Sequence, residues 1–384
     1  MTALTRVLTR LLPILALAAL TLAGLIGGYS GPAAAGEFDA ILQRIKLPPG
    51  FKISIFAKVP EPRSFAICKP LNTIYVGSRH SQIHVLRDKN LDGVADEVIE
   101  RANDLRVPNG LACQDSQLYI ALQDRIVFWP VPAEIDVKVP FQPLLPVKEG
   151  LPDKFLHGWR YAKFGPDRKL YVAIGAPCNI CDVQGLEGSI IRLNADGSGL
   201  ETVASGVRNS VGFDWHPKTK EMFFTDNGAD DMGDDVPPDE LNRVREIGGF
   251  YGFPYLGGKS VRLTGFTDKT PPKEPVAPAV EFQAHSANLG IHFYDGKQFP
   301  AEYRGDAFVA QHGSWNRTEP VGYQIMRVRF DGKGDPVGTE VFASGWLKDG
   351  NAVGRPVDIA ELPDGSLIVS DDFADVVYRI SYGK

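Results

Sequence analysis

The sequence lacks several patterns that mark common functional classes. Its 41 lysines and arginines form no runs and the formal net charge is −6, so nothing in the charge pattern favours a nucleic-acid partner. Only four cysteines are present, and none lies in a C-x-x-C-H motif, so this chain carries no attached c-type haem. The single C-x-x-C is followed by no second one and by no suitably spaced histidine, which argues against a zinc site.

The few cysteines that are present fit an oxidising compartment. Cys178 and Cys181 form the C-x-x-C, and a tight disulfide is the favoured interpretation, with a redox role as the alternative. Cys68 and Cys113 are the remaining pair.

The N-terminus has the pattern of an export signal. Two arginines precede an apolar run over residues 11–28, and the small residues Ala33-Ala34-Ala35 follow. Residues 1–35 are therefore predicted to be a signal peptide, although an uncleaved anchor is the alternative because the apolar run approaches the length of a spanning helix. In either case residues 36–384 are expected outside the cytoplasm, periplasmic or secreted, with membrane attachment only if the segment is retained.

One pattern recurs six times after this segment: a β-rich stretch, a short polar link and a second β-rich stretch. The repeats begin near residues 72, 117, 169, 221, 306 and 366. Alternating β-branched and aromatic residues between Pro, Asp and Gly turns predict antiparallel strands. The spacing is about one four-stranded blade, apart from an insertion near 250–290. Because a ring of blades removes exposed sheet edges, residues 36–384 are predicted to form a single all-β, six-bladed β-propeller.

The last repeat ends too early to complete its blade. The chain stops soon after the second strand of that repeat, at Ile380, which leaves the blade without its outer strand. Residues 51–57, a β-rich segment before the first repeat, are predicted to supply that strand and so to close the ring.

The loops of a propeller carry its function, and two of them hold candidate catalytic residues. His157 stands just before an inner strand, where an imidazole would project toward the channel as a general base. Arg208 and Asn209 occupy the matching place in the next blade, and Arg208 offers a planar fork for a carboxylate. A structural hydrogen bond for His157 and an inter-blade ion pair for Arg208 are the alternatives.

Two loops are candidates for calcium. Seven acidic residues fall between Asp226 and Glu240, and such a density favours a hard cation, with a solvated acidic loop as the alternative. A second loop begins at Asp88 with the D-x-N-x-D-G opening of a calcium loop, but Ile99 stands where the bidentate glutamate of an EF-hand belongs. A structural calcium and a polar hairpin turn are equally open there.

Polar and aromatic residues cluster again near the last two repeats. Trp315 is a candidate stacking surface, for which packing between blades is the alternative, and Arg317 and Arg355 are candidates to meet anionic groups. Taken with His157 and the acidic loop, these residues are what a polycarboxylate cofactor bound with a divalent cation would require.

The order of these motifs resembles a known family. The run H-G-W-R-Y-A-K-F-G-P-D-R-K-L-Y-V-A-I-G, residues 157–175, is similar to the catalytic segment of the soluble pyrroloquinoline-quinone (PQQ) glucose and sorbosone dehydrogenases. The stretches 208–209, 226–242, 312–317 and 354–358 also resemble that family, especially its sorbosone-dehydrogenase-like branch. The similarity runs from about Gly50 to the C-terminus.

The resemblance implies a mechanism. His157 would take a proton from a sugar hydroxyl as a hydride passes to a carbonyl carbon of the quinone, which a calcium ion polarises. The catalytic residues would be His157, Arg208 and Asn209, with Arg208 and Asn209 stabilising the developing oxyanion and fixing the cofactor. The calcium would be held by the backbone carbonyls of Gly228 and Ala229, near acidic positions matched by Asp239 and Glu240. The further cofactor-binding residues would be Asp239, Trp315, Arg317 and Arg355.

The sequence departs from the glucose enzymes at several positions. Arg160 and Tyr161 stand where those enzymes have Gly and then Arg, and Asn109 lies where they place a glutamine. Their lysine beside the cofactor has no clear counterpart, and Arg317 is the nearest candidate. The identity of the substrate therefore does not carry over.

The prediction from the sequence is PQQ- and calcium-dependent oxidation of an aldose or a related sugar or alcohol. Electrons would pass to a separate acceptor, a quinone or a cytochrome, since no haem motif is present. A calcium-dependent propeller hydrolase of the lactonase kind and a non-enzymatic, extracytoplasmic binding propeller are the alternatives.

Overall fold

The computed structural model describes residues 38–68, 73–131 and 141–383, all within one compact unit that spans 38–384. The predicted signal peptide, residues 1–35, lies outside the described residues. Strands dominate, and the helical elements of the described part are a four-residue helix α1 (Asp39–Leu42) and a 3-10 turn η1 (Ala301–Tyr303). No helix in these ranges is long and apolar enough to cross a membrane.

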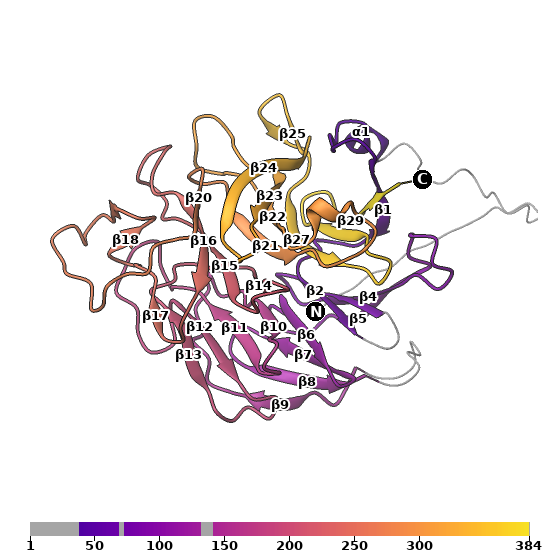
Figure 1. Ribbon diagram of the computed structural model, residues 1–384. Coiled ribbons are helices and arrows are strands. Elements are labelled where there is room, and N and C mark those ends of the chain that lie inside the picture. Colours follow the sequence, from indigo (N-terminus) through magenta and orange to yellow (C-terminus); the bar gives the residue numbers. More distant parts are fainter. Residues whose placement is uncertain (1–37, 69–72, 132–140, 384) are drawn as a thin grey trace, which may run out of the picture. The chain divides into compact units, whose positions relative to one another are not determined.

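Six antiparallel sheets surround a common centre, as Figure 1 shows, with strands β2, β6, β10, β14, β21 and β27 innermost. The first three blades are β2 (Phe65–Cys68), β3 (Thr73–Val76), β4 (Ile83–Arg87) and β5 (Glu97–Ala102); β6 (Gly110–Gln114), β7 (Gln117–Ala121), β8 (Ile126–Pro130) and β9 (Leu145–Lys148); and β10 (Ala162–Phe164), β11 (Leu170–Ile174), β12 (Ser189–Leu193) and β13 (Glu201–Ser205).

The remaining three blades complete the ring and confirm the predicted six-bladed propeller. They are β14 (Phe213–Trp215), β15 (Met222–Asp226), β16 (Asp239–Val244) and β20 (Val280–Phe282); β21 (Asn288–Phe293), β22 (Ala307–Gln311), β23 (Gln324–Phe330) and β24 (Pro336–Ser344); and β27 (Pro356–Glu361), β28 (Leu367–Asp371), β29 (Val376–Tyr382) and β1 (Phe51–Lys58).

The second strand of each blade is the most deeply buried, because neighbouring blades cover both of its faces. Every residue of β11, β15, β22 and β28 is buried; β11 is apolar throughout, and the other three begin with three or more apolar residues and end in polar ones. The outer strand β24 instead alternates over its first half between half-buried and exposed residues, as expected for a strand with one face in water. The core therefore consists of apolar layers between blades.

The N-terminal strand closes the ring as predicted. Strand β1 pairs antiparallel with β29, with Phe51 opposite Tyr382. The ring of Phe51 meets the rings of Phe299, Tyr303 and Phe342 edge-on, at centroid distances of 4.7, 5.1 and 5.0 Å. The sixth blade is thus assembled from both ends of the described chain.

Short additions decorate the blades. The insertion predicted near 250–290 contains β17 (Gly249–Phe250), which pairs parallel with β13, and a hairpin of β18 (Leu256–Gly257) and β19 (Val261–Arg262). A second hairpin consists of β25 (Leu347–Lys348) and β26 (Asn351–Ala352).

Both cysteine pairs form disulfides. The Cys68–Cys113 bond joins the inner strands β2 and β6 of adjacent blades. The Cys178–Cys181 bond closes a loop between β11 and β12.

Candidate active site

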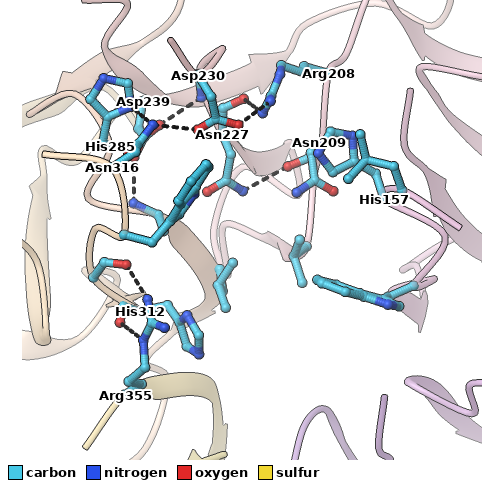
Figure 2. Close-up of a pocket in the computed structure, with 18 of the residues that line it drawn as sticks. His157, Arg208, Asn209, Asn227, Asp230, Asp239, His285, His312, Asn316 and Arg355 are labelled. Atoms are coloured by element: carbon cyan, nitrogen blue, oxygen red, sulfur yellow. Dashed lines mark hydrogen bonds and ion pairs between the residues drawn. The ribbon is translucent and has the colours of Figure 1, made fainter. Parts of the chain in front are cut away.

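A cavity of about 340 Å³ lies at one end of the central channel, among loops that precede inner strands or follow second strands. Seven of the residues singled out in the sequence line it: His157, Arg208, Asn209, Gly228, Asp239, Trp315 and Arg355. Figure 2 shows that the labelled side chains of His157, Arg208, Asn209, Asp239 and Arg355 come from several loops around a shared space. Ala229, Glu240 and Arg317 do not line this cavity.

His157 is held as a neutral base. Its Nδ1 lies 2.8 Å from the carbonyl oxygen of Ala176, which can only accept, so Nδ1 carries the proton and Nε2 keeps its lone pair. Burial, followed by the positive charge of Arg208, lowers the pKa of His157 to about 3. The imidazole therefore offers an unprotonated Nε2 throughout the physiological pH range.

The backbone around His157 requires a glycine beside it. His157 has a left-handed conformation, with φ of 51°. A Cβ atom on Gly175 would collide with the Cβ of His157, so this position has to be glycine for the imidazole to enter the cavity.

Arg208 spends most of its hydrogen-bonding capacity on this chain. A guanidinium has five N–H groups. Nε donates to the carbonyl oxygen of Asn179 at 2.9 Å, Nη1 donates to the carbonyl oxygen of Asn227 at 3.2 Å, and Nη2 donates to both Asn179 Oδ1 at 2.8 Å and Asp230 Oδ2 at 2.9 Å. The planar fork expected to hold a ligand carboxylate is therefore occupied, and one N–H of Nη1 remains for a ligand.

Asp226 sets the backbone that presents Arg208 and Asn209. Its carboxylate accepts the backbone N–H of Arg208 at 2.9 Å and that of Asn209 at 2.6 Å. Burial raises the pKa of Asp226 above its usual range. The side-chain amide of Asn209 makes no hydrogen bond within the described residues and lies beside His157 in Figure 2, available to a ligand.

The two predicted acidic metal neighbours point in different directions. Asp239 and Glu240 are successive residues of β16, so their side chains project from opposite faces. Asp239 lines the main cavity, and its oxygens accept the N–H groups of Gly228 and Ala287, each at 2.7 Å. Glu240 lines a separate, water-sized space that also contacts Ala229. Burial raises the pKa of both carboxyl groups.

The oxygen atoms suited to calcium are backbone carbonyls. In the described part of the chain, no three His, Cys, Asp or Glu side chains converge as a metal site. No hydrogen bond among the described residues reaches the carbonyl oxygens of Gly228 and Ala229, although Ala229 is fully buried. Buried carbonyls normally have a partner, so this pair fits the role of hard oxygen ligands.

Arg355 and Arg317 have different surroundings. Arg355 lines the cavity, and its guanidinium donates to the carbonyl oxygens of His312 at 3.0 Å and Gly313 at 2.6 Å, which leaves N–H groups for a ligand. Arg317 is bound to the acidic loop, through the carbonyl oxygen of Asp234 and an ion pair with Asp235 at 3.3 Å. It therefore ties that loop in place.

The positions at which the sequence departs from the glucose enzymes, Arg160, Tyr161 and Asn109, do not line the cavity either. Arg160 is fully buried, and its guanidinium donates to the carbonyl oxygens of Gln123, at 2.8 Å, and Pro152. Tyr161 packs in an apolar core cluster. Asn109 accepts from Arg63 Nε at 3.1 Å and donates to the Arg160 carbonyl at 2.7 Å, which links adjacent blades.

Sequence reasoning missed several lining residues. Arg63 and Arg79 line the cavity, and their guanidinium groups lie 5.7 and 4.9 Å from the ring of Trp159. Asn179, inside the C-x-x-C, anchors Arg208. Arg63 lies in the short segment before the first inner strand, as Arg208 and Arg355 lie before later inner strands, and this placement is the signal that would have found it.

The charge of the lining favours an anion. Arg63, Arg79, Arg208 and Arg355 contribute four positive charges, against the carboxylates of Asp230 and Asp239 in the lining and that of Asp372, which lies 2.8 Å from Arg63. Trp315, which is 72% exposed, stands at the mouth as an aromatic surface. A planar, anionic group such as a quinone polycarboxylate matches this donor set.

Comparison with known sequences shows similarity to a protein that the chain matches over most of its length. An uncharacterized protein from Borreliella burgdorferi is 37% identical over 363 residues, covering 90% of this chain and 93% of that protein. The TrAA12-like family model matches residues 258–382.

Solved structures of similar fold include two PQQ-binding sugar dehydrogenases and a family AA12 enzyme. The holo PQQ domain of pyranose dehydrogenase from Coprinopsis cinerea has a TM-score of 0.71 at 17% identity, over 88% of this chain and 97% of that one. A calcium structure of a Trichoderma reesei family AA12 enzyme has a TM-score of 0.73 at 18%, over 88% and 97%. The PQQ-bound aldose sugar dehydrogenase of Streptomyces coelicolor has a TM-score of 0.59 at 19%, over 88% and 99%. The predicted resemblance is thereby confirmed in fold, while the sorbosone branch is not distinguished.

Proposed function

The chain belongs to one family with the Borreliella burgdorferi protein and has the fold of the PQQ-dependent sugar dehydrogenases, and on this premise we propose that it oxidises an aldose or a related sugar or alcohol with PQQ as cofactor. The cavity supports this proposal because a proton acceptor and an anion-binding lining meet there with Gly228, whose carbonyl oxygen accepts no hydrogen bond among the described residues.

The observation that carries the proposal is the state of His157. Its Nδ1–H is committed to Ala176, so its unprotonated Nε2 faces the arginine-lined cavity. Removal of the hydroxyl proton of a sugar needs a base of this kind within reach of the substrate. His157 is thus the proposed general base.

The remaining residues would bind and orient. PQQ, when bound with calcium, would supply the two-electron acceptor that the side chains lack. Arg208, through its one remaining N–H, and Asn209, through its amide, would hold the quinone oxygen, and Arg355 would face a carboxylate. The carbonyl oxygens of Gly228 and Ala229 would hold the calcium, with Asp239 fixing the Gly228 backbone from behind.

We propose that the protein acts outside the cytoplasm, after export directed by residues 1–35, and passes its electrons to a separate quinone or cytochrome. Trp315, exposed at the mouth of the cavity, would contact cofactor or substrate.

The decisive experiment mixes purified cofactor-free protein with PQQ and calcium, then follows dye reduction with a panel of aldoses. Reduction that requires both additions, and that His157→Ala abolishes while quinone binding persists, would establish the proposal. Absence of calcium-dependent PQQ binding would overturn it. The lactone hydrolase and the non-enzymatic binding propeller would then be tested with lactones and with sugars alone.

A further inference from the structure

A second set of contacts lies immediately behind Arg208. Asn179 sits between Cys178 and Cys181, whose disulfide closes a four-residue loop. This loop presents two acceptors to the guanidinium: the Asn179 carbonyl oxygen to Nε at 2.9 Å and Asn179 Oδ1 to Nη2 at 2.8 Å. Asn179 therefore accepts two of the four hydrogen bonds that the Arg208 guanidinium donates.

Asn179 is in turn fixed to Asp230. Its Nδ2 donates to the Asp230 carbonyl at 2.9 Å, and the Asp230 N–H donates to Asn179 Oδ1 at 2.8 Å. Asp230 Oδ2 accepts from Arg208 Nη2 at 2.9 Å, which completes a triangle of hydrogen bonds among the three residues. Cys178 and Ile180 pack against a small apolar cluster that includes Ala229, so the loop has a firm base.

We infer that Asn179, held by the Cys178–Cys181 disulfide, is a positioning residue that aims the remaining N–H of Arg208 into the cavity. The effect of Asn179 on catalysis rests on the proposed function, whereas its effect on the position of Arg208 does not. A guanidinium on a flexible stem loses conformational freedom when it is aimed, and a rigid supporting contact supplies that order before a ligand arrives. Without the Asn179 side chain, Arg208 would lose the Nη2 contact to Oδ1 and would keep the backbone carbonyl of residue 179, Asn227 and Asp230 as partners.

The first test needs no cofactor. Hydrogen exchange of the Arg208 guanidinium is measured by NMR on arginine-labelled, cofactor-free protein, with Arg208→Lys identifying the signals. We expect exchange at least tenfold faster in Asn179→Ala, which removes the Oδ1 contact, and in Cys178→Ser/Cys181→Ser, which releases the loop. Unchanged exchange in both variants would overturn the inference.

Two controls separate positioning from general stability. Asn179→Asp keeps an acceptor for Nη2 and is expected to retain most of the protection. Cys68→Ser/Cys113→Ser removes the other disulfide, which joins β2 and β6 outside the cavity lining, and should leave Arg208 exchange at the wild-type rate. Equal acceleration in this control would assign the effect to the fold and would also overturn the inference.

Activity then separates the inference from the proposed function. In PQQ- and calcium-loaded protein, Asn179→Ala should lower kcat at least tenfold and change KM for the sugar less than threefold, and Asn179→Asp should restore most of kcat. If the loaded wild type is inactive but Asn179→Ala still accelerates the exchange of Arg208, the proposed reaction is wrong and the positioning role of Asn179 stands. An active wild type with unchanged kcat in Asn179→Ala would remove the catalytic role of Asn179.

Discussion

At the scale of single residues, the chemistry depends on which nitrogen of His157 is free. The Ala176 carbonyl takes the Nδ1 proton, and burial with the nearby Arg208 charge disfavours a second one. A histidine in water is half protonated near pH 6.5, whereas this one stays neutral well below that value. A base of low pKa is weak in equilibrium terms, but it is always in the reactive form.

The pH dependence of turnover follows from this state. Protonation of His157 removes the base, so kcat/KM of the loaded enzyme should fall on its acid side only below pH 6.5, in the direction of the lowered pKa. Arg208→Gln removes the nearby positive charge and should move that acid limb upward. An acid limb at or above pH 6.5 in the wild type would contradict the assignment of His157 as the base.

The glycine beside His157 gives a second prediction at this scale. Gly175→Ala would push the imidazole aside, and a displacement of about 1 Å at a reacting group costs on the order of a hundredfold in rate. We expect kcat/KM to fall about a hundredfold, with PQQ binding retained. Gly332→Ala is the matched control, since its added methyl group meets only the end of Lys218 at 3.7 Å. Equal activity of the two variants would refute the argument.

At the scale of elements, the strand β1 closes the ring by pairing with β29, and its Phe51 adds a large aromatic contact. The ring of Phe51 contacts four other aromatic rings, those of Phe299, Tyr303 in η1, Phe342 in β24 and Tyr382 in β29. Phe51→Ala should lower the free energy of unfolding by about 2 kcal/mol, less than truncation of a fully buried phenylalanine, because Phe51 is only half-buried. Urea denaturation measures this, with the exposed neighbour Lys52→Ala as the control that should change little.

The strands of the propeller were predictable from the sequence. Repeated β-rich pairs were enough to place six blades and the closing strand, since period-two patterns and turn residues are local signals. Strand assignment would equally have predicted that Asp239 and Glu240 diverge, because successive residues of β16 face opposite ways.

Contacts between loops could not be predicted from the sequence. Arg317 carries the same charge as Arg355, yet its partners are Asp234 and Asp235, and only the folded path of the acidic loop makes that choice. Asn179 was overlooked because a C-x-x-C is recognised by its cysteines, whereas here the residue between them makes the contacts.

At the scale of the whole molecule, a charged cluster links four blades away from the main cavity. His292 of β21 lies 3.3 Å from Asp214 of β14 and 3.4 Å from Glu361 of β27, and Lys163 of β10 lies 2.8 Å from Asp214. Burial opposes the charge on His292, but its two carboxylate partners outweigh burial and raise its pKa. Asp358, the other buried carboxylate here, has its pKa raised by burial to about 6.

This cluster makes stability depend on pH with a definite sign. A raised folded-state pKa means that the His292 contribution is complete below the unfolded value, about 6.5, and is lost as pH rises through the folded value. As the pH rises above about 6.5, the wild type should therefore lose unfolding free energy relative to His292→Gln, so the difference in unfolding free energy between the two proteins should narrow. Urea titrations across that range measure it, and parallel curves would contradict the prediction.

The closure by β1 also sets the order in which the protein can be made. Phe51 and Tyr382 face each other although about 330 residues separate them along the chain. During synthesis β1 emerges early and has to wait, with its edge unpaired, until β29 leaves the ribosome. Ring closure is thus the last and entropically costliest pairing, which predicts slow folding for a protein of this length. A premature stop before residue 376 would leave that early strand permanently without its partner, as a template for aggregation.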